Sequence, residues 1–227
     1  MNALSNTYIP ALRYHRLTRF YDPIVRFTTR ERTFKEALLG QADIQAGYRV
    51  LDLGCGTGTL ATMVKRSHRD AEVFGLDADV ETLKLAQEKM ARAGLEVQVD
   101  QGFASALPYA TASFDRVLSS LFFHHLSDKV KDQATLEVRR VLRPGGEFHI
   151  ADWGKPTSSA MRIAFFGIQM LDGFRTTRDS VTGVLPEILS LAGFETVELT
   201  RNYSTLFGTL SLYRARKPRR GEETNHP

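Results

Sequence analysis

Val50-Leu51-Asp52-Leu53-Gly54-Cys55-Gly56-Thr57-Gly58-Thr59-Leu60 is the stretch of sequence that decides the fold. It begins as an apolar run, passes through a turn with three glycines and continues into an amphipathic segment. Because glycine has no Cβ, the chain can turn sharply here and a ligand can approach its backbone. The stretch therefore predicts a strand, a tight ligand-binding turn and a helix.

The glycine spacing indicates which ligand the turn accepts. A nicotinamide dinucleotide requires the spacing G-x-G-x-x-G, whereas this turn has G-x-G-x-G and is preceded by Asp52. A carboxylate is unfavourable beside an anionic pyrophosphate and favourable beside the ammonium group of an amino acid. The turn therefore suits a cationic nucleoside better than a dinucleotide.

A second carboxylate follows the next apolar run, Phe74-Gly75-Leu76-Asp77-Ala78-Asp79. Asp77 can accept hydrogen bonds from both hydroxyls of a ribose, and Asp79 is expected to cap the helix that follows. A glycine turn alone is also compatible with a purely structural role. Its combination with Asp77 favours a nucleoside site.

Short apolar or β-branched runs alternate with amphipathic segments along the chain, which predicts a parallel sheet covered by helices. The last two runs are so close together that an antiparallel hairpin at one sheet edge is expected. The predicted strands are Arg49–Leu53, Glu72–Asp77, Glu96–Asp100, Phe114–Leu121, Glu147–Ala151, Thr196–Arg201 and Thr209–Ala215.

Three helices are predicted from apolar spacing. The first is Asp79–Ala93, with Val80, Leu83, Ala86 and Met90 on one face. The second is Ser127–Leu142, which ends before a turn expected at Arg143-Pro144-Gly145-Gly146. The third is Leu185–Ala192, followed by Gly193.

The segments VLDLGCGTGTL, FGLDAD, QGFASALPYATASFDRVLSS and RVLRPGG resemble the successive motifs of class I S-adenosylmethionine (SAM)-dependent methyltransferases. They cover Tyr48 to Ala151. The resemblance implies an α/β, three-layer Rossmann-like fold whose seven-stranded, mostly parallel sheet has the order 3-2-1-4-5-7-6 and an antiparallel edge hairpin. It also implies that SAM binds across the carboxyl ends of the first strands.

The resemblance assigns cofactor contacts to individual residues. Asp52 and the glycine turn would hold the methionine end, and Asp77 would hold the ribose. Phe103 stands where relatives carry an acid that binds the adenine amino group, so a stacking role for Phe103 and a backbone hydrogen bond from Ala104 are expected instead. The predicted cofactor-binding residues are Tyr21, Asp52, Gly54, Cys55, Gly56, Gly58, Asp77, Ala78, Phe103, Ala104 and Ser119.

Three residues are candidates for catalysis: His124 and His125, which follow the fourth strand, and Asp152, which follows the fifth. A histidine has a suitable pKa to remove a proton from a hydroxyl or thiol acceptor. Equally, the histidines could orient the loop beneath SAM, and Asp152 could anchor a loop rather than bind an acceptor. The segment lacks the N/D-P-P-Y/F/W motif, which argues against methylation of exocyclic amines or glutamine.

Two segments rich in aromatic residues and methionine, Tyr8–Phe34 and Ser158–Thr177, are expected to line an apolar acceptor pocket or to pack as core beneath a lid. The start YIPALRYHRLTRFYDPIVR resembles the leading helices of methyltransferases of the quinone-biosynthesis and phosphatidylethanolamine type, which implies that Tyr21 closes over SAM. We predict an N-terminal helical cap at 1–40, a SAM-binding domain at 41–217 with a lid at 153–180, and a disordered tail at 218–227.

The composition limits the remaining possibilities. Cys55 is the only cysteine, so the chain has no internal disulfide, and no metal site is expected. A secretory leader and a transmembrane helix are not predicted, so a cytoplasmic location is expected. The net charge of +4 is concentrated at the two ends of the chain. These basic ends could form a solvated surface or contact an anionic membrane peripherally.

The leading hypothesis is methyl transfer from SAM to an oxygen, nitrogen or carbon atom of a small, lipid-like or quinone-like metabolite. A DNA substrate is not expected. The alternatives are an RNA or protein methyltransferase, a non-catalytic SAM-binding module and a nicotinamide dehydrogenase. The glycine spacing and Asp52 disfavour the last of these.

Overall fold

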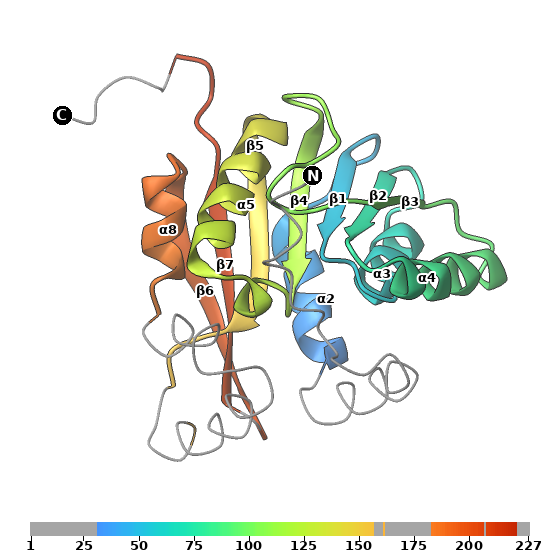
Figure 1. The fold of residues 1–227 in the computed structure, drawn as a ribbon, viewed down its shortest axis with the longest axis horizontal. Coiled ribbons are helices and arrows are strands. Elements are labelled where there is room, and N and C mark those ends of the chain that lie inside the picture. Colours follow the sequence, from blue (N-terminus) through green and yellow to red (C-terminus); the bar gives the residue numbers. More distant parts are fainter. Residues whose placement is uncertain (1–30, 157–160, 162–182, 207, 222–227) are drawn as a thin grey trace, which may run out of the picture.

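The computed structural model describes residues 31–156, 161, 183–206 and 208–221. They form one sheet with helices on both faces (Figure 1). The elements are α2 (Glu31–Ala42), β1 (Arg49–Leu53), α3 (Thr59–Ser67), β2 (Glu72–Asp77), α4 (Val80–Arg92), β3 (Gln98–Gln101), β4 (Phe114–Ser120), the 3-10 helix η2 (Phe123–His125), α5 (Asp128–Val141), β5 (Leu142–Trp153), α8 (Leu185–Leu191), β6 (Glu195–Thr205) and β7 (Gly208–Arg216).

The seven strands lie in the order β3-β2-β1-β4-β5-β7-β6, which confirms the predicted topology. Strands β1 to β5 run parallel to one another, and β7 is antiparallel to both β5 and β6. The order reverses at β1, where the chain leaves toward β2 on one side and β4 lies on the other. In parallel α/β sheets such a reversal opens a crevice at the carboxyl ends of the strands, where ligands bind.

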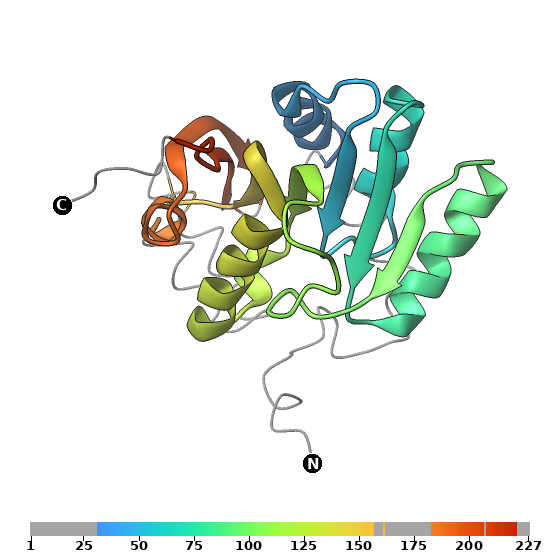
Figure 2. The same cartoon turned by 90° about the horizontal axis from the view of Figure 1, so that it is seen from above.

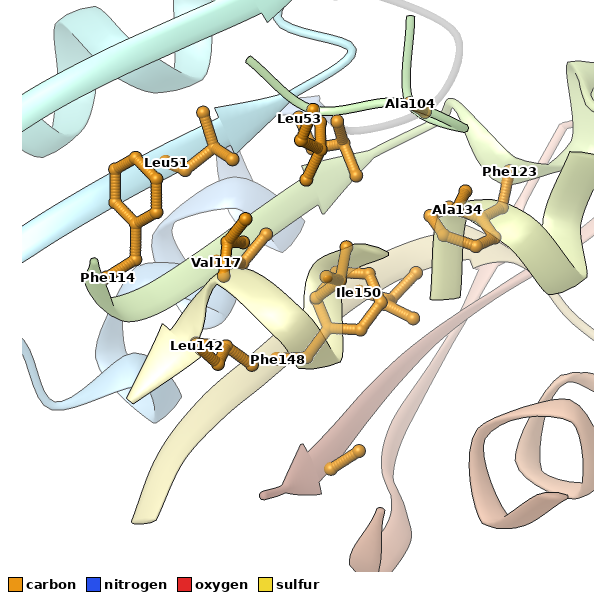
Figure 3. Close-up of a cluster of buried hydrophobic side chains, with 14 of the residues drawn as sticks. Leu51, Leu53, Ala104, Phe114, Val117, Phe123, Ala134, Leu142, Phe148 and Ile150 are labelled. Atoms are coloured by element: carbon orange, nitrogen blue, oxygen red, sulfur yellow. The ribbon is translucent and has the colours of Figure 1, made fainter. Parts of the chain in front are cut away.

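Two apolar clusters sandwich the sheet. One contains Leu51, Val117 and Ile150 from three neighbouring strands together with side chains of α5 and α8, and Figure 3 shows how these strand residues meet. The other lies on the opposite face and includes buried residues of α2, α3 and α4. Figure 2, seen from above, shows α2 and the pair α5 and α8 on opposite sides of the sheet. The result is the predicted three-layer arrangement.

Helix α2 belongs to this core. Phe34 and Leu38 are completely buried among side chains of the second cluster, beside β4 and β5. The residues before Glu31, including Tyr21, and most of the predicted lid lie outside the described residues.

Apart from shifts in the bounds of several strands, two local predictions differ from the structure. The turn expected at Arg143–Gly146 is instead an irregularity within β5, which starts at Leu142 and whose register with β4 shifts between Phe114 and Arg116. Gly145 and Gly146 continue the ladder because each forms a backbone hydrogen bond with Lys217. On α4, Leu83, Ala86 and Met90 are buried as expected, whereas Val80 is 43% exposed because it lies in the first turn, beyond the packed face.

We expect the aromatic centre of the first cluster to dominate stability. Phe148 is fully buried, with its ring 5.6 Å from that of Phe123, so Phe148→Ala should lower the free energy of unfolding by about 3–5 kcal/mol. Leu199, which is 51% exposed, provides the control. Leu199→Ala should change the free energy of unfolding by less than about 0.5 kcal/mol. Equal losses in urea unfolding would contradict this assignment of the core.

Candidate cofactor and active site

The glycine turn between β1 and α3 is held tightly against β2. The backbone N–H groups of Gly54 and Cys55 both donate to the carbonyl oxygen of Leu76, at 2.9 and 3.0 Å. The turn has left-handed backbone at Gly54, Gly56 and Gly58, with φ of 71°, 53° and 72°. Such angles are costly for residues with a Cβ, which explains why glycine occupies these positions.

The three glycines differ in what surrounds them. A Cβ on Gly54 would overlap the ring of Phe122, and a Cβ on Gly58 would lie 2.5 Å from Cε of Met90. A Cβ on Gly56 would meet nothing closer than 4.0 Å. Two glycines therefore allow close packing within the protein, whereas Gly56 leaves bare backbone facing open space, as the approach of a ligand requires.

Asp52 lies beneath the turn and is 1% exposed. Its Oδ2 accepts a hydrogen bond of 2.9 Å from the backbone N–H of Ala61 in α3. The pKa of Asp52 is raised to about 7, chiefly by burial and to a lesser degree by the charge of Asp77, against the opposing effects of Lys35 and the Ala61 hydrogen bond. A cation bound here would stabilise the ionised carboxylate, so the position suits the positively charged end of SAM.

Asp77 fastens the glycine turn from the end of β2. Its Oδ2 accepts from the N–H of Gly56 at 2.9 Å, and its Oδ1 accepts from the N–H of Asp79 at 3.0 Å. Burial raises the pKa of Asp77, although these hydrogen bonds oppose the effect. Each carboxylate oxygen retains a lone pair that a ribose hydroxyl can use. Asp79 caps α4 as predicted, since its Oδ1 accepts from the N–H of Glu81 and Thr82.

Two other predicted contact residues direct their side chains into the protein. The thiol of Cys55 is buried against Gly75, and burial raises its pKa well above the ordinary value, so it stays a neutral thiol. The hydroxyl of Ser119 is fully buried and donates to the carbonyl of Leu53 at 3.0 Å. Both positions can therefore offer a ligand only their backbone.

The loop after β3 lies at the same edge of the sheet. Its first residue, Gly102, donates a 3.0 Å hydrogen bond to the backbone carbonyl of Asp77, which places the start of the loop beside that residue. Phe103 is 49% exposed, whereas Ala104 is buried. A half-exposed ring next to the predicted nucleoside site is suited to stacking on a purine.

The two candidate catalytic elements meet at the ends of β4 and β5. The Nδ1 atom of His124 lies 2.6 Å from Oδ1 of Asp152, whose Oδ2 accepts from the backbone N–H of His124 at 3.2 Å. Asp152 also accepts from the N–H of Trp153 at 2.7 Å. Burial opposes ionisation of Asp152, but His124 and the hydrogen bonds outweigh it and lower its pKa. The carboxylate is thus engaged in holding η2 in place.

His125 is the histidine with an unused nitrogen. Its ring lies 3.9 Å from the ring of His124, and its Nε2 is buried without a hydrogen-bond partner among the described residues. Burial and the charge of His124 lower the pKa of His125 well below the ordinary value, so the imidazole is neutral near pH 7. A neutral imidazole with one free nitrogen can accept a proton or donate a hydrogen bond to a ligand.

Sequence reasoning missed Phe122, which connects these two regions. Leu121 adopts a left-handed conformation at φ 54°, although only glycine does so readily, and its N–H is fixed to the carbonyl of Ala151 at 2.8 Å. This elbow directs the ring of Phe122 onto Gly54. The sequence gives only a weak signal for this role, because Phe122 stands beside Phe123 in an apolar run that is typical of the core.

Comparison with known proteins agrees with this geometry. Residues 50–146 match the family described as Methyltransferase domain. The chain is 36% identical over 172 residues to Methyltransferase GfsG of Streptomyces halstedii, covering 73% of this chain and 59% of that protein. It is 36% identical over 121 residues to Demethylmenaquinone methyltransferase of Thermus thermophilus, covering 53% of this chain and 54% of the relative. The chain thus spans less than two thirds of these relatives.

Solved structures share the fold at low sequence identity. Phosphoethanolamine N-methyltransferase 2 of Haemonchus contortus, in complex with S-adenosyl-L-methionine, superposes with a TM-score of 0.64 at 19% identity, covering 82% of this chain and 53% of that chain. The cyclase SpnF superposes with a TM-score of 0.65 at 22% identity, covering 82% and 81%.

The sheet order, the glycine turn and its carboxylates define a class I SAM-binding α/β domain. With the sequence matches, they assign the region of residues 50–146 to the methyltransferase-domain family of class I fold, and SAM is the cofactor that this family and the fold indicate. The bare backbone at Gly56 and the buried carboxylates Asp52 and Asp77 fit that cofactor.

Replacing Asp52 should separate stability from binding. The pKa of Asp52 in the folded chain is raised to about 7, so folding favours the protonated carboxyl. The free energy of unfolding therefore falls as pH rises from the pKa of the unfolded chain to about 7. Asp52→Asn should therefore increase the free energy of unfolding above pH 7 by on the order of 2–4 kcal/mol, with little gain at pH 4. The same variant should bind SAM weakly. A variant less stable than the wild type at pH 8 in urea unfolding would contradict the assignment.

Gly56 offers a second test, with Gly47 as its matched control. Both have left-handed backbone and open space at the Cβ position, so alanine at either should cost about 1–2 kcal/mol of stability. Only Gly56→Ala should weaken binding of S-adenosylhomocysteine, by at least ~10-fold in calorimetry. Equal affinities of the two variants would exclude Gly56 from the cofactor site.

Proposed function

We propose that this chain transfers the methyl group of SAM to a small, apolar or amphiphilic metabolite bearing an ionisable hydroxyl, such as a quinol-like ring. The observation that carries the proposal is the free, buried Nε2 of His125 beside the His124–Asp152 pair at the carboxyl edge of the sheet. Relatives named demethylmenaquinone methyltransferase support a quinol-like acceptor.

SAM supplies a methyl group on a positively charged sulfur, which leaves as a neutral thioether. The chain contributes alignment and proton removal. His125 accepts the proton of the acceptor hydroxyl at Nε2, so that the oxygen, or the ring carbon that it activates, can bond to the methyl group. The positive charge gained by the imidazole lies close to Asp152, whose charge favours the protonated form of His125.

His124 and Asp152 act as positioning residues in this proposal. Asp152 accepts three hydrogen bonds, two from His124 and one from Trp153, and is 2% exposed, which leaves little access for a substrate. Its role is to fix η2 so that His125 faces the site. This arrangement favours the loop-anchoring interpretation of Asp152 over direct binding of a cationic acceptor.

We assign the walls of the acceptor pocket to the predicted N-terminal cap, with Tyr21 over the cofactor, and to the predicted lid after Trp153. Both segments lie largely outside the described residues, so this part of the proposal rests on their aromatic composition. No helix in the described part of the chain is long and apolar enough to cross a membrane. Peripheral contact through the basic N-terminal segment stays a prediction.

His125 should determine the rate without affecting cofactor binding. We expect His125→Asn to lower kcat by about 100-fold while the Kd for S-adenosylhomocysteine changes less than about twofold. His68, near the start of β2 at the opposite sheet edge, provides the control, and His68→Asn should retain full activity. Acceptors would be found by mass spectrometry of cell extract incubated with methyl-labelled SAM and each variant.

The outcomes of this experiment separate the alternatives. Label in a small phenolic or quinol-like molecule supports the proposal. Label in RNA or protein would identify an RNA or protein methyltransferase instead. Binding of SAM without any labelled product would identify a non-catalytic SAM-binding module. Full activity of His125→Asn would remove the histidine from the mechanism.

A further inference from the structure

The loop after β3 is held in place by a part of the chain that the predicted site does not include. Glu137 and Arg140, in the last turns of α5, bind its main chain directly. Oε2 of Glu137 accepts from the backbone N–H of Leu107 at 2.7 Å. Arg140 donates from Nη2 to the carbonyl of Leu107 at 3.0 Å and from Nη1 to the carbonyl of Tyr109 at 2.8 Å.

The two side chains also bind each other, at 2.7 Å between Nε and Oε1 and at 2.8 Å between Nη2 and Oε2. The hydrogen bond from Arg140 lowers the pKa of Glu137, so the pair is ionised at neutral pH. A guanidinium can bind a carboxylate with two nitrogens and still reach two carbonyls, which an ammonium cannot do in a fixed geometry. The pair therefore acts as a rigid clamp, and we name it the α5 clamp.

The α5 clamp is the second of two fixed points around the exposed turn at Phe103. The first is Gly102, whose N–H is bound to the carbonyl of Asp77 at 3.0 Å. Between Gly102 and Leu107, the loop closes through a hydrogen bond of 3.0 Å from the N–H of Ala106 to the carbonyl of Phe103. The backbone from Gly102 to Leu107, which includes Ala104, is thus anchored on both sides.

Beyond the clamp, the same helix end continues to hold the chain. The N–H groups of Ala112 and Ser113 donate to the carbonyls of Arg140 and Val141 at 3.0 and 2.8 Å. The Tyr109 hydroxyl donates to Asp100 at 2.9 Å, which ties the loop back to β3. These contacts would hold the later part of the loop without the clamp, so the clamp chiefly determines the position of residues 103–107.

We propose that Glu137 and Arg140 are positioning residues for recognition of the purine of the cofactor: through Leu107 they hold the Ala104 N–H and the Phe103 ring where the base binds. This inference rests on the assignment of Phe103 and Ala104 to the base. It predicts a dependence on the chemistry of the base that a purely structural role would not show. Adenine N1 accepts a hydrogen bond from a backbone N–H, whereas N1 of hypoxanthine carries a hydrogen and cannot.

The test compares binding of S-adenosylhomocysteine and S-inosylhomocysteine by calorimetry. The wild-type chain should prefer the adenine ligand by roughly 10-fold, and Arg140→Ala should weaken its binding by about 10-fold and reduce the preference to about twofold or less. Arg140→Lys and Glu137→Gln, which retain charge or shape, should show intermediate losses. Arg92, which forms an exposed pair with Glu88 in α4, provides the control, and Arg92→Ala should match the wild type.

An Arg140→Ala variant with unchanged affinity and preference would overturn the proposal. So would an equal loss for both ligands, because it would indicate damage to the fold rather than to base recognition. If Arg140→Ala does not fold, the same criteria apply to Arg140→Lys and Glu137→Gln. Only binding is measured, so a failure to find any methyl acceptor leaves this test intact. A wild-type chain that binds neither ligand would remove the cofactor site and this proposal together.

Discussion

The site depends on one tight turn that the sheet holds in place. Three left-handed glycines reverse the chain between β1 and α3, and a single carbonyl, that of Leu76, accepts hydrogen bonds from two consecutive N–H groups of this turn. Asp77, the next residue of β2, holds the same turn through the N–H of Gly56. The topology makes this possible, because β1 and β2 are parallel neighbours and their carboxyl ends coincide. The geometry of the predicted cofactor site therefore depends on the register of β1 and β2 as well as on the glycine motif.

The second half of the site follows from the same register on the other side of β1. Strands β4 and β5 end together, so the elbow at Leu121 and the carboxylate of Asp152 are close enough for Asp152 to order η2. The two halves touch where Phe122 packs on Gly54. The Phe122 ring is thus a direct contact between the glycine turn and the segment that carries the histidines, through which a displacement of either one can displace the other.

Much of this could be predicted from the sequence, because the controlling signals are local. The apolar runs ending at Leu53 and Asp77 predicted β1 and β2 to the residue, and the crowded final runs predicted the β6–β7 hairpin. The Arg143–Gly146 segment was misjudged because local turn chemistry was overridden by pairing with Lys217, which is distant in sequence. The contacts of Phe122 and of the α5 clamp were missed for a similar reason. These contacts join elements that are distant in the sequence, and the periodicity of apolar residues does not indicate which elements lie next to one another.

The buried position of Asp52 has a consequence for how the protein exchanges charge with its surroundings. With a pKa of about 7, a sizeable fraction of empty molecules carries a proton on Asp52 at neutral pH. That proton neutralises the carboxylate in the absence of a bound cation. A positively charged ligand stabilises the ionised carboxylate and so lowers its affinity for the proton. Binding of the ligand is therefore accompanied by release of a fraction of a proton to solvent. Binding heats would then vary with the ionisation enthalpy of the buffer, and departure of the neutral product would draw the proton back.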